Sequence, residues 1–218
     1  MTQPAAPQPE EITRMFTRAG GEYLFARWAR PIVPVVFGVD DATLATVKAA
    51  IEAVVALAGH RMAETDPELG ANLMIFFFRD WKELLDVPGL DHLVEGLAGT
   101  VARLDAAGAN QYRAFRFEKD GAIRACFVFI RVDAALDDTP AETVALSLAA
   151  RSILFWGDHA FDRHPALAEL DGAAVIHPAM ALVIRAAYDP SMPHSARDPG
   201  HALRLAARVG LLSAEAGK

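Results

Sequence analysis

The chain has 218 residues, of which 53% are hydrophobic and 22% are charged, so it can bury a sizeable core and a wholly disordered chain is excluded. Its formal net charge at pH 7 is −7, from 28 acidic and 21 scattered basic residues. Nucleic acid is therefore not expected as a partner, because its binding needs a basic face. The apolar run Leu73–Phe78 is far too short to cross a bilayer, so no membrane insertion is expected either.

The ends of the chain differ from its middle in composition. The first ten residues are rich in Pro and Gln and have neither the basic start nor the apolar stretch of a secretory signal. We expect a disordered segment over 1–9, a single domain over 10–212 and a flexible tail over 213–218. The single cysteine, Cys126, lies in an apolar run and is expected to be a buried, inert thiol. Because one cysteine gives no sign of an oxidising compartment, we expect a cytoplasmic protein.

The first third of the chain alternates between helix and strand signals. Residues 10–24 show a loose helical pattern. Residues 31–38 read as a strand, and Pro34, which has no N–H, places it at a sheet edge. Asp40 or Asp41 can cap the helix that follows, in which apolar residues recur at helical spacing as far as Gly59.

The middle of the chain carries the strongest strand signals. Residues 72–79 are almost entirely apolar, which is typical of a central strand buried on both faces. One or two helices are expected over 80–107. Residues 112–118 and 122–132 then predict a hairpin, because the Asp-Gly pair at 120 and 121 is a turn signal.

The next helix is the best marked in the sequence. Thr139 is expected as its N-cap, Pro140 as its first residue and Glu142 as the partner that completes a capping box. The run continues to Trp156 with Arg151 as the one charge after residue 143, which predicts a mostly buried helix that Gly157 ends.

The last part reads as a polar loop to about residue 172, followed by helices over 178–188 and 199–209. The order is α-β-α-β-α-β-β-α-α-α. It predicts an α+β fold with a mixed sheet of about four strands and helices mainly on one face.

Known catalytic motifs are missing from the sequence. We find no phosphate-binding glycine loop, no dinucleotide fingerprint, no nucleophile elbow and no His-Glu-x-x-His zinc motif. No cofactor is therefore expected.

One stretch does gather carboxylates and imidazoles. It contains Asp158, His159, Asp162 and His164. Such groups can bind a metal or move protons, so His159, Asp162 and His164 are an alternative metal site and Asp158 with His159 an alternative catalytic pair. The structural alternative is that Asp158 and His159 satisfy backbone groups beyond a helix end.

A candidate pocket can be assembled from Arg27, Trp28, Trp156 and His177. Arg27 and Arg30 could bind an anion, or pair with the many acids while Trp28 packs under the sheet. His177 precedes a proline and reads as a loop or cap residue.

Three motifs carry a resemblance across residues 22–195. They read Arg27-Trp28-x-x-Pro31-Ile32, Ala71-Asn72-Leu73-Met74-Ile75 and Ala187-Tyr188-Asp189-Pro190. In this order they resemble a bacterial domain family of unknown function with a zincin-like (metalloprotease-like) fold. Zincins place metal ligands on the helix after the hairpin, and the equivalent run here, Thr139 to Trp156, has no His. The resemblance thus implies a degenerate peptidase scaffold that lacks the zinc motif.

Three functions follow as hypotheses. The first is a non-catalytic binding or scaffold module that takes a peptide or protein along the edge strand near residues 31–37. The second is a metal-dependent hydrolase that uses the residues at 158–164. The third is a structural homo-oligomer, which exposed apolar area would reveal.

Overall fold

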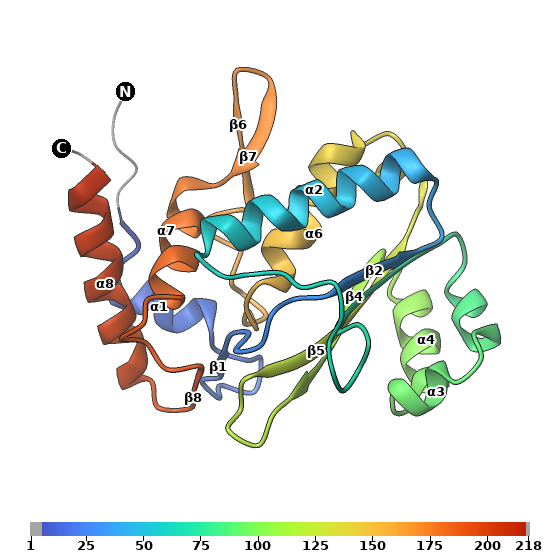
Figure 1. Ribbon diagram of the computed structural model, residues 1–218, viewed down its shortest axis with the longest axis horizontal. Coiled ribbons are helices and arrows are strands. Elements are labelled where there is room, and N and C mark those ends of the chain that lie inside the picture. The colour runs from blue at the N-terminus through green and yellow to red at the C-terminus, as the bar shows by residue number, and fades with distance from the viewer. Residues whose placement is uncertain (1–5, 217–218) are drawn as a thin grey trace.

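The computed structural model describes residues 6–216 and is built around one four-stranded sheet (Figure 1). The strands lie in the order β2 (Pro34–Phe37), β3 (Leu73–Phe78), β5 (Ile123–Arg131) and β4 (Gln111–Phe117). β2, β3 and β5 are parallel, and β4 pairs antiparallel with β5. The expected α+β fold with a mixed sheet of four strands is confirmed, with β3 in the interior of the sheet.

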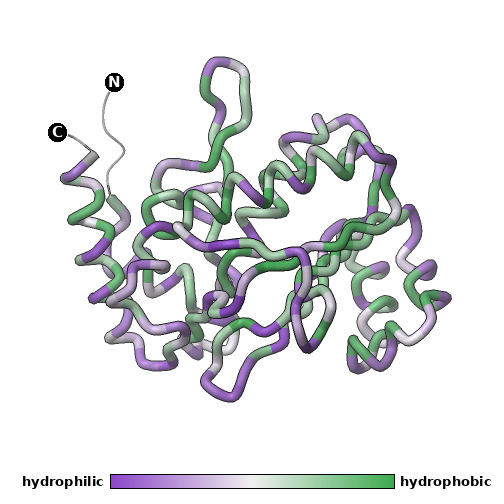
Figure 2. Tube along the Cα trace, in the orientation of Figure 1, coloured by the Kyte–Doolittle hydropathy of each residue, from purple (hydrophilic) through white to green (hydrophobic). Residues whose placement is uncertain are grey.

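One face of the sheet is covered by α2 (Asp41–Leu57), α6 (Ala141–Ser152) and α7 (Pro178–Ala187). Asp40 caps α2 as expected, since its carboxylate accepts a hydrogen bond of 2.7 Å from the Thr43 N–H. α2 and α6 pack against each other over the core, and Figure 2 shows hydrophobic residues concentrated along the central strands beneath them.

The other face is also covered, which corrects the prediction of helices mainly on one face. The 3₁₀ helix η1 (Trp81–Asp86), α3 (Leu90–Leu93) and α4 (Leu97–Ala106) pack there against Phe127 and Phe129 (Figure 1). The physical reason lies in β5, whose alternate residues are apolar on both faces, so each face needs a cover.

The remaining elements are α1 (Pro9–Met15), β1 (Phe25–Ala26), α5 (Ala134–Asp137), β6 (Leu167–Leu170), β7 (Ala173–Ile176), β8 (Ser195–Ala196) and α8 (Gly200–Ala216). Of these, α5 lies at the carboxyl ends of the parallel strands, where Asp137 pairs with Arg79. α1 packs against α8, while β6 and β7 form a hairpin where the sequence predicted a polar loop to about residue 172 and no strand. The observed element order therefore contains four short strands that were not expected.

Within the described residues, helix extends further toward both ends of the chain than predicted. Residues 1–5 of the expected disordered segment and residues 217–218 of the expected tail lie outside the described residues. Of the rest, Gln8 is the N-cap of α1 and α8 continues through residues 213–216.

The start and end of α6 also differ from the prediction. Pro140, not Thr139, is the N-cap, and no capping box forms. The Thr139 hydroxyl instead donates a hydrogen bond of 2.8 Å to the carbonyl of Ala135, because α5 immediately precedes it. α6 ends at Ser152, so Gly157 does not terminate it.

Gly157 is required for another reason, which is close packing against the segment after α1. Its N–H donates to the Met15 carbonyl at 2.6 Å, and a Cβ there would lie 2.4 Å from the Thr17 carbonyl oxygen. We therefore expect Gly157→Ala to lower the free energy of unfolding by about 2 kcal/mol, since backbone must move to admit the methyl group. Urea denaturation measures the change.

A matched control for Gly157→Ala is Gly210→Ala. Gly210 lies inside α8, and nothing lies within 4 Å of its Cβ position. Alanine there is expected to raise stability by about 0.5–1 kcal/mol, because it restricts the unfolded chain. A Gly157→Ala variant as stable as the parent would contradict the packing argument.

Candidate functional site

Three arginines from distant parts of the chain meet in one cavity of about 180 Å³. We call it the arginine pocket. It is lined by Arg18, Arg113, Arg151, Phe115, Phe155 and Phe161, together with Trp156, Gly157 and Asp158. The pocket is thus a cationic hollow with aromatic walls in a chain whose net charge is −7.

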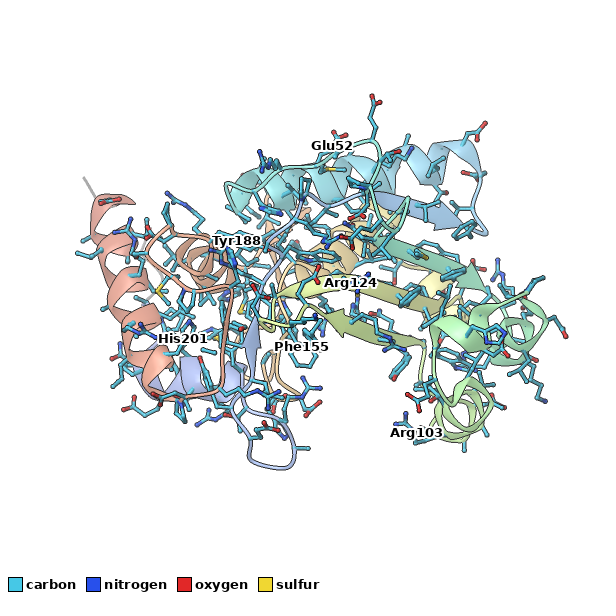
Figure 3. All side chains as sticks on the ribbon, turned by 60° about the horizontal axis from the view of Figure 1, so that its bottom comes forward. Glu52, Arg103, Arg124, Phe155, Tyr188 and His201 are labelled. Atoms are coloured by element: carbon cyan, nitrogen blue, oxygen red, sulfur yellow. The ribbon has the colours of Figure 1, made fainter. Side chains whose placement is uncertain are left out.

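The fold brings these side chains together from β4, from α6 and from the segments that follow α1 and α6. Arg113 and Phe115 are two residues apart on β4, so they share the face of the sheet that α6 covers. Arg151 lies in the last turn of α6, where a cation interacts favourably with the helix dipole. Phe155 and Phe161 follow in the segment after α6, and Figure 3 shows Phe155 beside the sheet.

Arg113 has weak partners for its charge. Its Nε donates to the Ser152 hydroxyl at 3.4 Å, and its two terminal nitrogens lie 3.4 and 3.3 Å from the Gln111 amide oxygen. Among residues 6–216 it forms no ion pair with a carboxylate. Burial, with a contribution from nearby Arg151, lowers the pKa of Arg113 to about 10, so it remains protonated at neutral pH.

The charge of Arg151 likewise has only weak partners among the described residues. Its Nε lies 3.4 Å from the Ser147 hydroxyl, and its guanidinium carbon lies 4.1 Å from the centroid of the Phe161 ring. Within the described chain it has no carboxylate partner, and burial lowers its pKa. The cation–π contact holds the side chain in place without neutralising its charge.

Arg18, by contrast, is paired. One terminal nitrogen lies 3.4 Å from an Asp158 carboxylate oxygen, and the other donates to the Trp156 carbonyl at 2.6 Å. Its guanidinium also lies 4.4 Å from the centroid of the Phe155 ring. Two of the three guanidiniums therefore retain unmatched positive charge and free N–H donors.

This arrangement is suited to holding an anion. A partly buried cation without a counter-charge is unfavourable, and a carboxylate or phosphate would supply both the charge and the acceptors. The planar guanidinium matches the oxygen geometry of either group. A volume of about 180 Å³ has room for one such group with a few attached atoms.

The carboxylates and imidazoles at 158–164 do not gather as one site. Asp158 accepts a hydrogen bond of 2.7 Å from the Ala19 N–H, in addition to its ion pair with Arg18. His159 and Asp162 lie 2.9 Å apart, and both are well exposed. Asp158 therefore anchors the loop to the segment after α1, as its structural alternative implied.

The fourth residue of that stretch lies apart from the others. The ring of His164 is 5.1 Å from that of His177, centroid to centroid. No group of three or more His, Cys, Asp and Glu side chains in the described part of the chain is arranged to hold a metal ion.

The four residues of the candidate pocket have separate structural roles. Arg27 donates to the Met192 carbonyl at 3.1 Å, and the indole N–H of Trp28 donates to the Ser152 carbonyl at 3.0 Å. Trp156 stacks on a phenylalanine of α1's C-cap and lines the arginine pocket. His177 is the N-cap of α7, and burial, with a smaller contribution from neighbouring His164, lowers its pKa. The arginine pocket thus includes only Trp156 of the four.

Arg113 and Arg151 were not among the predicted site residues, because the basic residues lie far apart in the sequence and are scattered along it. Two signals pointed toward them: Arg151 is the lone charge in the apolar body of its helix, and Arg113 alternates with Phe115 on a strand next to that helix. Neither signal shows that the two side chains meet.

A further cavity of about 390 Å³ lies at the carboxyl ends of the parallel strands, where open sheets commonly bind ligands. Its charged groups are already matched within the chain. Arg79 pairs with Asp137 at 3.3 Å, and Asp40 caps α2. The arginine pocket is therefore the better candidate for a binding site, because two of its guanidiniums have no carboxylate partner among residues 6–216.

Comparisons with known proteins add no further constraint. Within residues 6–216, no helix combines the length and apolarity needed to span a bilayer. No protein-family model, curated protein or solved structure matches the chain. The zincin-like resemblance accordingly stays a prediction.

Proposed function

We propose that the protein is a non-catalytic binding module on a degenerate zincin-like scaffold, and that it holds an anionic group of its ligand in the arginine pocket. The observation that carries this proposal is the pair of cations, Arg113 and Arg151, which meet in one cavity without a carboxylate partner among residues 6–216. An acidic chain has many carboxylates available for pairing, so leaving these two unmatched favours a role in binding.

The walls of the pocket support the same proposal. Phe155 and Phe161 lie under the Arg18 and Arg151 guanidiniums, which fixes their orientation before a ligand arrives. The two ordered rings also offer apolar surface to whatever is attached to the anionic group. A ligand with a carboxylate or phosphate next to an apolar portion fits this chemistry.

The test is a titration of ¹⁵N-labelled protein with inorganic phosphate and, separately, with acetate at constant ionic strength. We expect saturable shifts of the Arg113 and Arg151 Nε–Hε resonances with a Kd of about 1 mM, the range for a ligand of few atoms. The stronger of the two titrations identifies the anionic group. Arg113→Gln should abolish the saturable shift of the Arg151 resonance, and Arg151→Gln that of the Arg113 resonance.

The matched control is Arg103→Gln on α4, at the far side of the molecule (Figure 3). Arg103 is exposed and lies outside the pocket, so its loss should leave both titrations unchanged. Resonances of Arg113 and Arg151 that respond no more than that of Arg103 would refute the proposed function.

A further inference from the structure

β4 is an edge strand whose outer side is open to pairing. Among residues 6–216, β5 is its one strand neighbour. The Arg131 N–H donates to the Asn110 carbonyl at 2.9 Å, which fixes the pattern of the antiparallel ladder. Gln111, Arg113 and Phe115 therefore direct their backbone N–H and C=O groups away from β5. Of these groups, the Phe115 carbonyl accepts a hydrogen bond of 3.2 Å from the Arg116 side chain, which an added strand would displace.

The side-chain face of this edge leads directly into the arginine pocket. Arg113, Phe115 and Phe117 alternate along β4 and face the same side. Phe155 lines both the arginine pocket and a second cavity of about 470 Å³, which Phe117 also lines. The two cavities thus flank one strand, with unmatched positive charge at one end and exposed aromatic surface at the other.

The opposite edge of the sheet is less suited to this role than sequence analysis expected. β2 has four residues and begins with Pro34, which cannot donate a hydrogen bond. Just before it, both backbone groups of Ile32 are already bonded to the segment at 61–63. β4 has seven residues and no proline.

Resting on the proposed function, we propose that the ligand is an extended acidic peptide that adds to the sheet as a fifth strand along β4. One of its carboxylates lies between Arg113 and Arg151, and an apolar side chain four residues away packs on Phe117 and Phe155. Backbone hydrogen bonds to the open edge supply affinity, and the arginine pocket selects the acidic residue.

The probe is a fluorescein-labelled peptide as long as β4, capped at both ends and made in both sequence directions. It alternates Val and Thr, with Asp at the position opposite Arg113 and Leu opposite Phe117. In fluorescence anisotropy, we expect one direction to bind and its Asp→Asn version to bind at least about tenfold more weakly. Arg113→Gln should cause a similar loss, and Arg103→Gln none.

Backbone methylation distinguishes strand addition from simple anion binding. Methylating the peptide amides that face β4 should weaken binding by about tenfold or more, whereas methylating those that face away should not. Equal binding of both methylated peptides would overturn the inference. So would failure of all the peptides while phosphate or acetate still shifts Arg113 and Arg151, an outcome that leaves the proposed function standing. Failure of peptides and small anions alike overturns both.

Discussion

Asn72→Ala is expected to lower the free energy of unfolding by about 4 kcal/mol, because the Asn72 side chain satisfies several buried groups at once. Its amide oxygen accepts a hydrogen bond of 2.8 Å from the Val33 N–H, and its amide nitrogen donates to the Pro31 carbonyl at 2.9 Å. The same nitrogen donates to the Asp66 carboxylate at 3.1 Å. Since Asn72 is 0% exposed, its truncation leaves these buried groups without the partner that satisfied them.

The charge on Asp66 makes this loss larger. Although burial raises its pKa, the Glu68 N–H and the Arg30 guanidinium lead the bonds that lower the pKa of Asp66 to about 2. The carboxylate is therefore ionised and needs every donor that it has. Truncation of Asn72 leaves the Asp66 carboxylate bonded to Arg30 and to backbone N–H groups. It also removes one donor and leaves a cavity beside the carboxylate.

Urea denaturation followed by tryptophan fluorescence measures the effect of Asn72→Ala. The control is Asn110→Ala, a half-buried asparagine whose side chain bonds to Asp133 at the surface, for which we expect a loss of at most about 1 kcal/mol. Equal, small losses for the two variants would contradict the role assigned to Asn72.

Acid should destabilise the protein through His201, the second large effect that we expect. His201 is 0% exposed, and burial, with a smaller contribution from Arg204, lowers its pKa to about 4. Its Nδ1 lies 2.7 Å from the Tyr23 hydroxyl, while its Nε2 has no hydrogen-bond partner. A protonated ring would therefore place an N–H donor and a charge in an apolar setting beside Phe25.

The sign of this effect follows from proton binding. The pKa of His201 is lower in the folded than in the unfolded chain, so the unfolded chain takes up the proton first as pH falls. The contribution of neutral His201 to the free energy of unfolding is fully present above about pH 6.5. It declines by about 3 kcal/mol in total as the pH falls to about 4. Carboxylates such as Asp66 titrate below that window.

The matched variant is His201→Asn, whose amide can replace Nδ1 as the partner of Tyr23 but does not titrate. His60 and His177 also have lowered pKa values, so both proteins should lose some stability in acid. We expect the parent to lose about 2.5 kcal/mol more than the variant between pH 7 and about pH 4.5, measured by urea denaturation. Parallel stability curves would show that His201 does not carry the effect.

The sequence predicts those parts of the fold that local chemistry determines. The β4–β5 hairpin follows from the Asp-Gly turn, where Gly121 has a φ of +86°. The start of α2 follows from Asp40, whose side chain and capped N–H are three residues apart. In both cases the groups that decide the structure are close along the chain.

The structural features that the sequence does not predict depend on contacts between residues that are far apart along the chain. β1 and β8 pair across about 170 residues and are two residues long, so no periodic pattern marks them. The start of α6 was misplaced because the Thr139 hydroxyl bonds to the preceding turn instead of capping. Arg18, Arg113 and Arg151 form a site only through tertiary packing.

The charges along β4 also bear on how copies of the chain behave toward one another. An unpaired edge of seven residues is a template onto which a second copy can add, and such growth leads to aggregation. If two copies met along β4 with Arg113 opposite Arg113 of the second copy, the two cations would repel each other. This repulsion is expected to disfavour self-association in that register.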